Sequence, residues 1–441
     1  MSERPVGRFQ RGLYWFTHDL RLHDLAPLLE ACERCQQLLF VYCHDSRQLQ
    51  PGRYGERPLG THRERFLAQS LDDLASLLEA RGQYLVVESG LPVECLGRLI
   101  EQEHIEAIFR SAPVGFDERR DLGLLEKRFP ARHWHVSLTH TLFQQHDLPF
   151  SLPDLPATFT PFRKRVEGLA IPAPTAGPAS LPRPPLTSVE RIHRVQSWPT
   201  TQRLMGGCTA GAAHLDEYFS SQAPARYKQT RNALSGWDAS GKFSAWLAAG
   251  CISAREVVAR IAHYEITQAR NESTQWLVFE LLWREYFQWY ALRHGARLFD
   301  FSGVKSQKPL TSFYPERYRR WCMGTTPFPL VNACMNELRD TGWLSNRGRQ
   351  IVASALVHEL GLDWRFGASW FEHQLMDYDV AVNWGNWQYL AGVGADPRGH
   401  RHFDLEKQAA EHDPDGSYRQ QWAPGDAPDM LDSVDAADWP L

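Results

Sequence analysis

Short apolar runs and helical patterns alternate over the first part of the chain. Runs of strand type lie at 13–17, 38–43, 83–88, 107–109 and 134–137, and helical periodicity occupies ranges between them, such as 26–35, 62–81 and 92–102. This order predicts a parallel, Rossmann-like α/β sheet domain over residues 9–145. Ligands of such sheets bind beyond the carboxyl ends of the strands, which directs attention to His18, Asp19, His44, Asp45 and the loop 110–118. No GxGxxG or Walker loop occurs there, which argues against dinucleotide or nucleoside triphosphate binding by those routes.

Prolines crowd the chain after this domain and then give way to helical patterns. Residues 146–205 indicate a Pro-rich interdomain linker with a short helix at 159–168. Residues 206–422 predict a larger all-α domain, and residues 423–441 predict an acidic, disordered tail. The helices expected in the all-α domain lie at 214–220, 241–249, 254–270, 273–292, 327–341 and 347–360.

The stretch 376–394, MDYDVAVNWGNWQYLAGVG, fits neither a helical stripe nor a strand alternation. It places Asp377, Asp379 and Asn383 among tryptophans and small apolar residues. An unpaired buried carboxylate is costly, so these groups need partners from elsewhere in the chain. Two interpretations stay open, a surface loop with solvated acids and a polar clamp for a large planar cofactor.

Composition narrows the class of protein. Of the 441 residues 23% are charged and 43% are hydrophobic, as in a globular protein, and no apolar run approaches the length of about 18 residues that could span a bilayer. Because the net charge is -4, any nucleic-acid site must be a local basic patch. The 16 tryptophans suit stacking or electron transfer as well as a core. Eight cysteines without regular spacing predict reduced thiols and a cytoplasmic protein, and no metal site is predicted.

One carboxylate lies on an aromatic helical face. In the helix expected at 275–290, Glu280 shares a face with Trp276, Trp283 and Phe287. A glutamate in such a face needs a hydrogen-bonded partner or a ligand, and burial would raise its pKa. An ordinary aromatic core stripe is the alternative.

Two further stretches carry positive charge or backbone donors. One gathers Asn346, Arg347, Arg349 and Gln350 at the start of a helix. Arginines gain nothing from the dipole there, which indicates anionic partners, with Arg349 expected to pair with Asp377 or a phosphate. The other, SGKFSAWLAAG at 240–250, offers backbone N–H groups, hydroxyls and a lysine that suit a pyrophosphate. A solvated basic face and a simple helix cap are the respective alternatives.

A resemblance to the FAD-binding domain of the photolyase/cryptochrome family rests on motifs in matching order over 210–422. They are YKQTR, SGKFSAWLAAGCIS, FELLWREYF, TGWLSNRGRQIVAS, LGLDWR and DYDVAVNWGNWQYLAGVGADPR. Near the N-terminus, FTHDLRLHDLAPL resembles the family's opening signature, with Leu25 where Asn is usual. Within the family, SNRGRQ and WGNWQY are most similar to cryptochrome-DASH.

The resemblance implies a U-shaped FAD in the all-α domain. The residues that it assigns to the cofactor are Tyr227, Ser240, Gly241, Lys242, Phe243, Ser244, Arg284, Asn346, Arg349, Asp377, Asp379 and Asn383. Asn383 would lie beside the flavin N5, where an amide, which cannot ionise, suits a flavin that can be fully reduced.

The resemblance also implies a pocket for a flipped-out cyclobutane pyrimidine dimer. Its residues would be Glu280, Trp283, Asn346, Arg347, Gln350 and Tyr389, with Arg231 and Lys228 binding the lesion's phosphates. Gln350 and Tyr389 stand where ordinary dimer photolyases have Met and Trp. A more polar pocket offsets less of the flipping cost, so single-stranded DNA is the expected substrate. The histidines of a (6-4) photolyase pocket are missing at these motif positions.

Electron transfer and an antenna chromophore are implied as well. Trp387 and Trp364 match the first two members of the family's tryptophan chain, whereas the third position is Thr311, which cannot carry a hole. Trp321 is the expected substitute, with Tyr318 and Tyr314 as alternatives. Glu118, in GFDERRD, matches a carboxylate that holds an antenna methenyltetrahydrofolate, with Asp117 in place of the usual Asn.

The function implied is blue-light-driven electron transfer from reduced FAD that repairs cyclobutane pyrimidine dimers, the electron then returning to the flavin. Two rivals remain, a blue-light receptor that signals without repair and a nucleic-acid binding protein that uses flavin only structurally. We expect a monomer that contacts DNA through a local basic patch.

Overall fold

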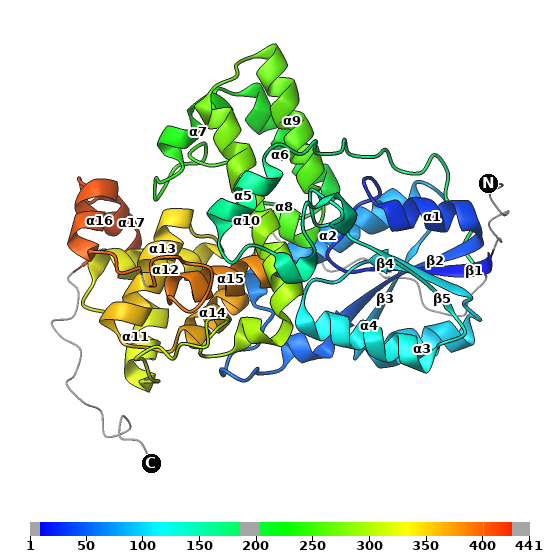
Figure 1. Ribbon diagram of the computed structural model, residues 1–441, viewed down its shortest axis with the longest axis horizontal. Coiled ribbons are helices and arrows are strands. Elements are labelled where there is room, and N and C mark those ends of the chain that lie inside the picture. The colour runs from blue at the N-terminus through cyan, green and yellow to red at the C-terminus, as the bar shows by residue number, and fades with distance from the viewer. Residues whose placement is uncertain (1–8, 186–202, 400, 426–441) are drawn as a thin grey trace.

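The computed structural model describes residues 9–185, 203–399 and 401–425. Its strands form one parallel sheet, as predicted, and the order of the strands is β3-β2-β1-β4-β5. They are β1 (Phe9–Phe16), β2 (Cys35–Asp45), β3 (Leu85–Gly90), β4 (Ala107–Ser111) and β5 (His133–Ser137). The sheet occupies one side of the molecule and the helices after residue 206 occupy the other (Figure 1).

Both faces of the sheet are buried, because successive residues of a strand point to opposite faces. In β1, Leu13 and Trp15 pack with the face covered by α3 (Pro92–Gln102) and α4 (Phe116–Arg128), at the lower side of Figure 1. Tyr14 and Phe16 face the other way, toward α1 and α2, in a core that is continuous with the helical part. The two helices on that side are α1 (Ala26–Arg34) and α2 (Thr61–Glu79).

At the carboxyl ends of the strands, the polar residue that follows the central strand β1 is buried. Asp19 follows β1 and is fully buried, where it accepts hydrogen bonds from the Tyr14 hydroxyl at 2.8 Å and the Ser111 hydroxyl at 2.6 Å. The ligand role considered for Asp19 is therefore replaced by a structural one, since its lone pairs are taken by the sheet itself. His18 stays exposed, with its Nε2 3.9 Å from Glu118 Oε1.

Helices dominate the rest of the chain. The short helix predicted in the linker is present as α5 (Phe159–Val166), whereas 186–202 and most of the predicted tail lie outside the described residues. The domain limits at 145, 205 and 422 stay predictions. The helices that follow are α6 (Cys208–Ser220), α7 (Ala223–Thr230), α8 (Ser244–Ala249), α9 (Ala254–Thr267), α10 (Glu272–His294), α11 (Pro315–Met323), α12 (Pro329–Thr341), α13 (Asn346–Ser354), α14 (Trp364–Gln374), α15 (Val380–Leu390), α16 (Leu405–His412) and α17 (Ser417–Trp422).

The stretch 376–394 contains a helix, contrary to the expectation that no helical stripe covers it. Asp379 caps α15 by accepting hydrogen bonds from the backbone N–H groups of Ala381 at 2.9 Å and Val382 at 3.1 Å. The helix is apolar on most sides and largely buried, so it carries no amphipathic stripe for a periodicity argument to find.

Two other features complete the helical part. The helix expected at 347–360 begins at Asn346 and changes at Ala355 into a π-helical turn that runs to Glu359. Within the described residues, no helix is long and apolar enough to cross a bilayer.

Candidate functional site

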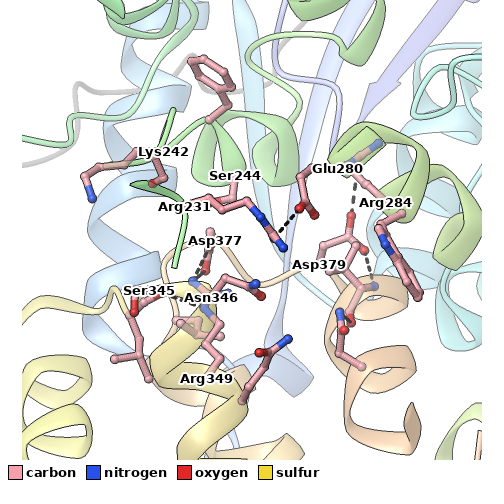
Figure 2. Close-up of a pocket in the computed structure, with 18 of the residues that line it drawn as sticks. Arg231, Lys242, Ser244, Glu280, Arg284, Ser345, Asn346, Arg349, Asp377 and Asp379 are labelled. Carbon is pink, nitrogen blue, oxygen red and sulfur yellow. Dashed lines mark hydrogen bonds and ion pairs between the residues drawn. The ribbon is translucent and has the colours of Figure 1, made fainter. Parts of the chain in front are cut away.

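A cavity of about 490 Å³ opens between α10, α13, α15 and the segment before α8. All of the residues that the sequence assigns to the cofactor line it, together with most of those assigned to the substrate (Figure 2). The predicted substrate and electron-transfer residues on its wall are Glu280, Trp283, Asn346, Gln350, Tyr389, Arg231 and Trp387.

One wall holds a buried ion pair. Arg349 Nη2 donates to both carboxylate oxygens of Asp377, at 3.0 and 2.7 Å, while its Nε donates to the carbonyl of Leu344 at 2.9 Å. The Asp377 side chain is 1% exposed. Arg349 is therefore the partner of the buried Asp377 carboxylate, as expected from the sequence. Arg349 also lines the cavity.

A second carboxylate is held at the start of α15. Asp379 Oδ2 accepts a hydrogen bond from Gln288 Nε2 at 2.7 Å and lies 3.5 Å from Arg284 Nη2. Arg284 Nη1 also donates to the carbonyl of His140 in the sheet domain. The Arg284 guanidinium therefore lies between a carboxylate and backbone carbonyls, with its orientation fixed from two domains.

The segment before α8 has the shape of a cradle. Lys242 has a φ of 49°, which is rare for a residue with a side chain. A Cβ at Gly241 would lie 2.5 Å from the Phe243 ring, so only glycine fits there. The Lys242 ammonium lies 3.5 Å from the centroid of the Trp343 ring, and burial lowers its pKa to about 8. A buried lysine with a depressed pKa gains from an anionic ligand.

An amide on α15 is oriented by the backbone. Asn383 Nδ2 donates to the carbonyl of Ala368 at 3.0 Å. Because the NH₂ group is used there, the Oδ1 atom of Asn383 is left to accept from a group in the cavity. The side chain is buried, so this acceptor is shielded from bulk water.

Glu280 has the partners that its place on an aromatic face requires. Its Oε1 accepts hydrogen bonds from Arg231 Nη1 at 2.7 Å and from Trp276 Nε1 at 2.9 Å, and Figure 2 shows the Arg231 and Glu280 side chains pointing toward one another. Burial raises the Glu280 pKa, although the Arg231 charge opposes that shift. Its Oε2 atom has no hydrogen-bond partner among the described residues, so it can accept from a ligand or, when protonated, donate.

Two aromatic rings border the same region. Trp283 stacks on Phe159 of the linker helix, with ring centroids 3.8 Å apart and planes at 12°. One face of the indole is therefore covered by the protein. Tyr389 meets Trp283 edge-on, at 5.6 Å and 77°, so the two rings form a corner and not a parallel slot.

Two residues predicted for the substrate do not line the cavity. Arg347 follows Asn346 on α13 and points about 100° further around that helix, toward Gln408 of α16 and Asn232. Lys228 is half-exposed and its Nζ lies 2.6 Å from Glu272 Oε2. The place of Arg347 corrects its assignment to the pocket wall, whereas the phosphate-binding role of Lys228 stays a prediction.

The three tryptophans predicted for electron transfer make two separate ring contacts, and the order in which they act stays a prediction. Trp387 lies on the cavity wall, and its ring is 6.2 Å from Trp321. Trp364 instead lies 5.8 Å from Trp384, and its indole N–H donates to the carbonyl of Phe301. Trp321 was expected as the third member, after Trp364, but it neighbours the first. Trp321 also contacts the rings of Phe371, at 6.3 Å, and Tyr318, at 6.4 Å, and of these two only the tyrosine was considered for electron transfer.

Glu118 lies away from this cavity, near the start of α4. Its pKa is lowered, because the His18 imidazole and the Arg110 charge outweigh the effect of burial. Arg110 is fully buried and stacks over the Trp15 ring at 3.7 Å. The surroundings therefore keep Glu118 ionised, as an acceptor at the surface between the sheet and the helices.

Several wall residues escaped prediction. Trp343, Tyr378, Asn386 and Arg401 all line the cavity. Trp343 and Asn386 lie within motifs that were recognised, but only neighbouring residues of those motifs were assigned to the site. Arg401 lies in an irregular segment after α15, where no periodicity indicates which side chain turns inward.

The cysteines show no redox arrangement. All eight are free, and burial raises the pKa of the Cys32 and Cys35 thiols to about 12, so neither is a ready nucleophile. Within the residues that the structure describes, no group of His, Cys, Asp or Glu has the geometry of a metal site.

Comparison with known proteins agrees with this geometry. Residues 12–181 match the family described as DNA photolyase, and residues 276–430 match the FAD binding domain of DNA photolyase. Cryptochrome DASH from Idiomarina loihiensis is 50% identical over 439 residues, covering 98% of this chain and 97% of the relative. The crystal structure of a Synechocystis cryptochrome superimposes with a TM-score of 0.89 at 39% identity, covering 96% of this chain and 90% of the other. A bacterial class III photolyase from Agrobacterium tumefaciens gives a TM-score of 0.81 at 26% identity, with 96% and 88% covered.

Proposed function

The chain belongs to the photolyase/cryptochrome family, within its cryptochrome DASH group, and from this premise we propose that it repairs cyclobutane pyrimidine dimers in DNA under blue light, with a preference for single strands. The matched families make FAD its cofactor. The monomeric state expected from the sequence is part of the same proposal.

The cavity fits FAD by its donors and acceptors. Lys242 and the N–H groups of the cradle before α8 suit a pyrophosphate, and the low Lys242 pKa indicates a cation without an adequate anion. Asp377, Asp379 and the guanidinium groups that hold them offer both acceptors and donors to a polar ring edge or a ribose. The free Oδ1 atom of Asn383 suits the N–H of a reduced flavin.

When bound, reduced FAD excited by blue light would supply the electron that splits the dimer and would take it back afterwards. The protein's part is to hold the lesion and to keep water away. Glu280 offers its Oε2 atom to a base edge, and Trp283 and Tyr389 offer ring surface at the corner that they form. Arg231 Nη1 donates to Glu280 Oε1 at 2.7 Å, which holds the guanidinium at this wall. Its remaining N–H groups would donate to a phosphate of the lesion.

The preference for single strands follows from the same wall. Gln350 and Tyr389 line the cavity, and neither gives the stacking area of a tryptophan. Phe159 also covers one face of Trp283, which limits the ring surface left for a base. Less stacking offsets less of the cost of unpairing, so a lesion in duplex DNA is disfavoured.

An antenna chromophore is the second cofactor that we propose. Glu118 is held ionised and can accept from the amino group and ring nitrogen of a pterin such as methenyltetrahydrofolate. Its place between the sheet and the helices would put that chromophore beside, and not inside, the FAD cavity.

The observation that carries the proposal is the presence of Glu280, Trp283 and Tyr389 on the wall of the same cavity as the cofactor residues. The test is to illuminate the FAD-loaded protein with single- and double-stranded oligonucleotides that contain one dimer. We expect repair, faster in single strands. A signalling receptor, or a protein that uses flavin only structurally, would repair neither strand form.

A further inference from the structure

The hydroxyl of Tyr389 is held by a residue outside the predicted site. Arg401 Nη2 donates a hydrogen bond to this hydroxyl, and the Arg401 Cζ atom lies 4.4 Å from the centroid of the Tyr389 ring. One guanidinium thus contacts both the oxygen and the π system of the ring. Both residues line the cavity.

Arg401 is itself fixed by a buried acid. Its Nε donates to Asp396 Oδ2 at 2.7 Å, and Asp396 is 0% exposed. The other oxygen of Asp396 accepts from the backbone N–H of Arg398 at 2.9 Å. The backbone carbonyl of Arg401 accepts from the buried hydroxyl of Ser354 at 3.1 Å. The guanidinium is therefore anchored through its backbone and through its side chain.

The ion pair of Asp396 with Arg401 and the hydrogen bond of Arg401 to Tyr389 connect the Tyr389 ring to a buried carboxylate. Tyr389 is half-buried and meets Trp283 only edge-on, so packing on that side alone does not define its rotation. The bond from Arg401 adds a directional restraint. A charge-assisted hydrogen bond contributes more than a neutral one, and planar guanidinium geometry fixes the direction of the donor.

We infer that Arg401, anchored by Asp396, is a positioning residue that orients Tyr389 against the damaged bases and so helps the site to discriminate damaged from undamaged DNA. The inference rests on the proposed function. Arg401 is assigned to Tyr389 because two of its three guanidinium nitrogens, Nε and Nη2, bind Asp396 and the Tyr389 hydroxyl.

A neighbouring arginine provides the matched control. Arg398 is exposed, and within the described residues its side chain has no hydrogen bond or ion pair. Removing either arginine takes away one positive charge within the same short segment. Loss of the Arg398 charge should weaken the binding of damaged and undamaged DNA alike, whereas only the Arg401 change removes the hydrogen bond to Tyr389.

The experiment measures dark binding of FAD-loaded protein to a short single-stranded oligonucleotide with one thymine dimer and to the same oligonucleotide undamaged, by fluorescence anisotropy. The readout is the ratio of the two affinities. Arg401→Gln is made together with Asp396→Asn, so that no unpaired buried carboxylate remains. We expect this double variant to lose most of the ratio, roughly tenfold, as for removal of one charge-assisted hydrogen bond. Arg398→Gln should keep the ratio.

Two further variants separate orientation from folding. Tyr389→Phe, which cannot accept from Arg401, should lose a similar share of the ratio, and combining it with the double variant should lose no more. Arg401→Lys should restore part of it. An unchanged ratio in the double variant, or equal losses for damaged and undamaged DNA, would overturn the inference. A wild-type ratio near one would instead overturn the proposed function.

Discussion

Arg349 Nη2 donates to both carboxylate oxygens of Asp377, at 3.0 and 2.7 Å, and the Asp377 side chain is 1% exposed. Taking away the arginine leaves a carboxylate in the interior without its cation. Arg349→Ala should therefore lower the free energy of unfolding by about 3–5 kcal/mol. Denaturant unfolding followed by circular dichroism measures the loss. A second variant that adds Asp377→Asn should recover part of it, and no recovery would contradict this reading of the pair.

The Glu280 carboxylate offers one free oxygen toward the cavity. Glu280→Ala should lower the repair rate roughly tenfold, as expected for one hydrogen bond to a charged group, while FAD stays bound. Repair under blue light and the flavin absorbance measure the two effects. Glu272→Ala, an exposed change on the same helix, is the control. Undiminished repair by Glu280→Ala would refute the role.

Lys242 should make FAD binding pH-dependent. Burial lowers its pKa to about 8 in the cofactor-free protein, whereas an anionic pyrophosphate favours the charged form. Above pH 8 the lysine must take up a proton to bind, so the dissociation constant should rise by up to about tenfold per pH unit. Titrating cofactor-free protein with FAD between pH 7 and 9 tests this. Lys242→Arg, whose guanidinium stays protonated, should remove the dependence, and an identical dependence there would disprove the assignment.

Ring contacts pair Trp321 with Trp387 and Trp364 with Trp384, and we expect both pairs to contribute to photoreduction. Trp387→Phe should abolish blue-light reduction of bound FAD in the presence of a thiol, because this ring lies on the cavity wall. Trp321 lies next to Trp387, and Trp364 leads toward Trp384. Trp321→Phe and Trp364→Phe should each slow the loss of the oxidised flavin absorbance, and the double variant should stop it. If Trp364→Phe alone abolished photoreduction, Trp321 would have no role in it.

Glu118 and its neighbour allow a matched test of antenna binding. Glu118→Ala should lose bound methenyltetrahydrofolate, measured by its absorbance after purification or reconstitution, and should keep FAD. Asp117→Ala removes an exposed carboxylate that pairs with Arg120 at 2.9 Å, and should keep both chromophores. Equal folate occupancy in both variants would show that Glu118 is not the acceptor.

Much of the fold could be predicted because its signals are local. The strands of the sheet appear as apolar runs that are buried on both faces, and the pairing of Arg349 with Asp377 follows from the cost of an unpaired acid. The helix α15 was missed for the opposite reason. It is buried on most sides, so its sequence has no polar face to set against an apolar one.

The positions of side chains such as Arg347, Lys228 and Arg401 could not be predicted, because they depend on contacts distant in sequence. Arg347 turns toward α16, and Lys228 is held by Glu272, 44 positions away. Arg401 enters the cavity from an irregular segment that Ser354 and Asp396 anchor. Motif spacing places a residue on an element, but it does not say which distant partner captures the side chain.

Adjacent residues of α10 bind the same short segment of the sheet domain. Arg284 extends to the cavity wall and the carbonyl of His140, while Glu285 accepts the backbone N–H of Leu142 at 2.7 Å. This turn of α10 is therefore one of the contacts that hold the helices against the sheet, together with the bond from Arg21 to the carbonyl of Gly250. If the sheet domain binds an antenna chromophore and the helical domain binds FAD, these contacts help to set the relative orientation of the two transition dipoles. A substitution of Glu285 should then lower the efficiency of energy transfer while both chromophores stay bound.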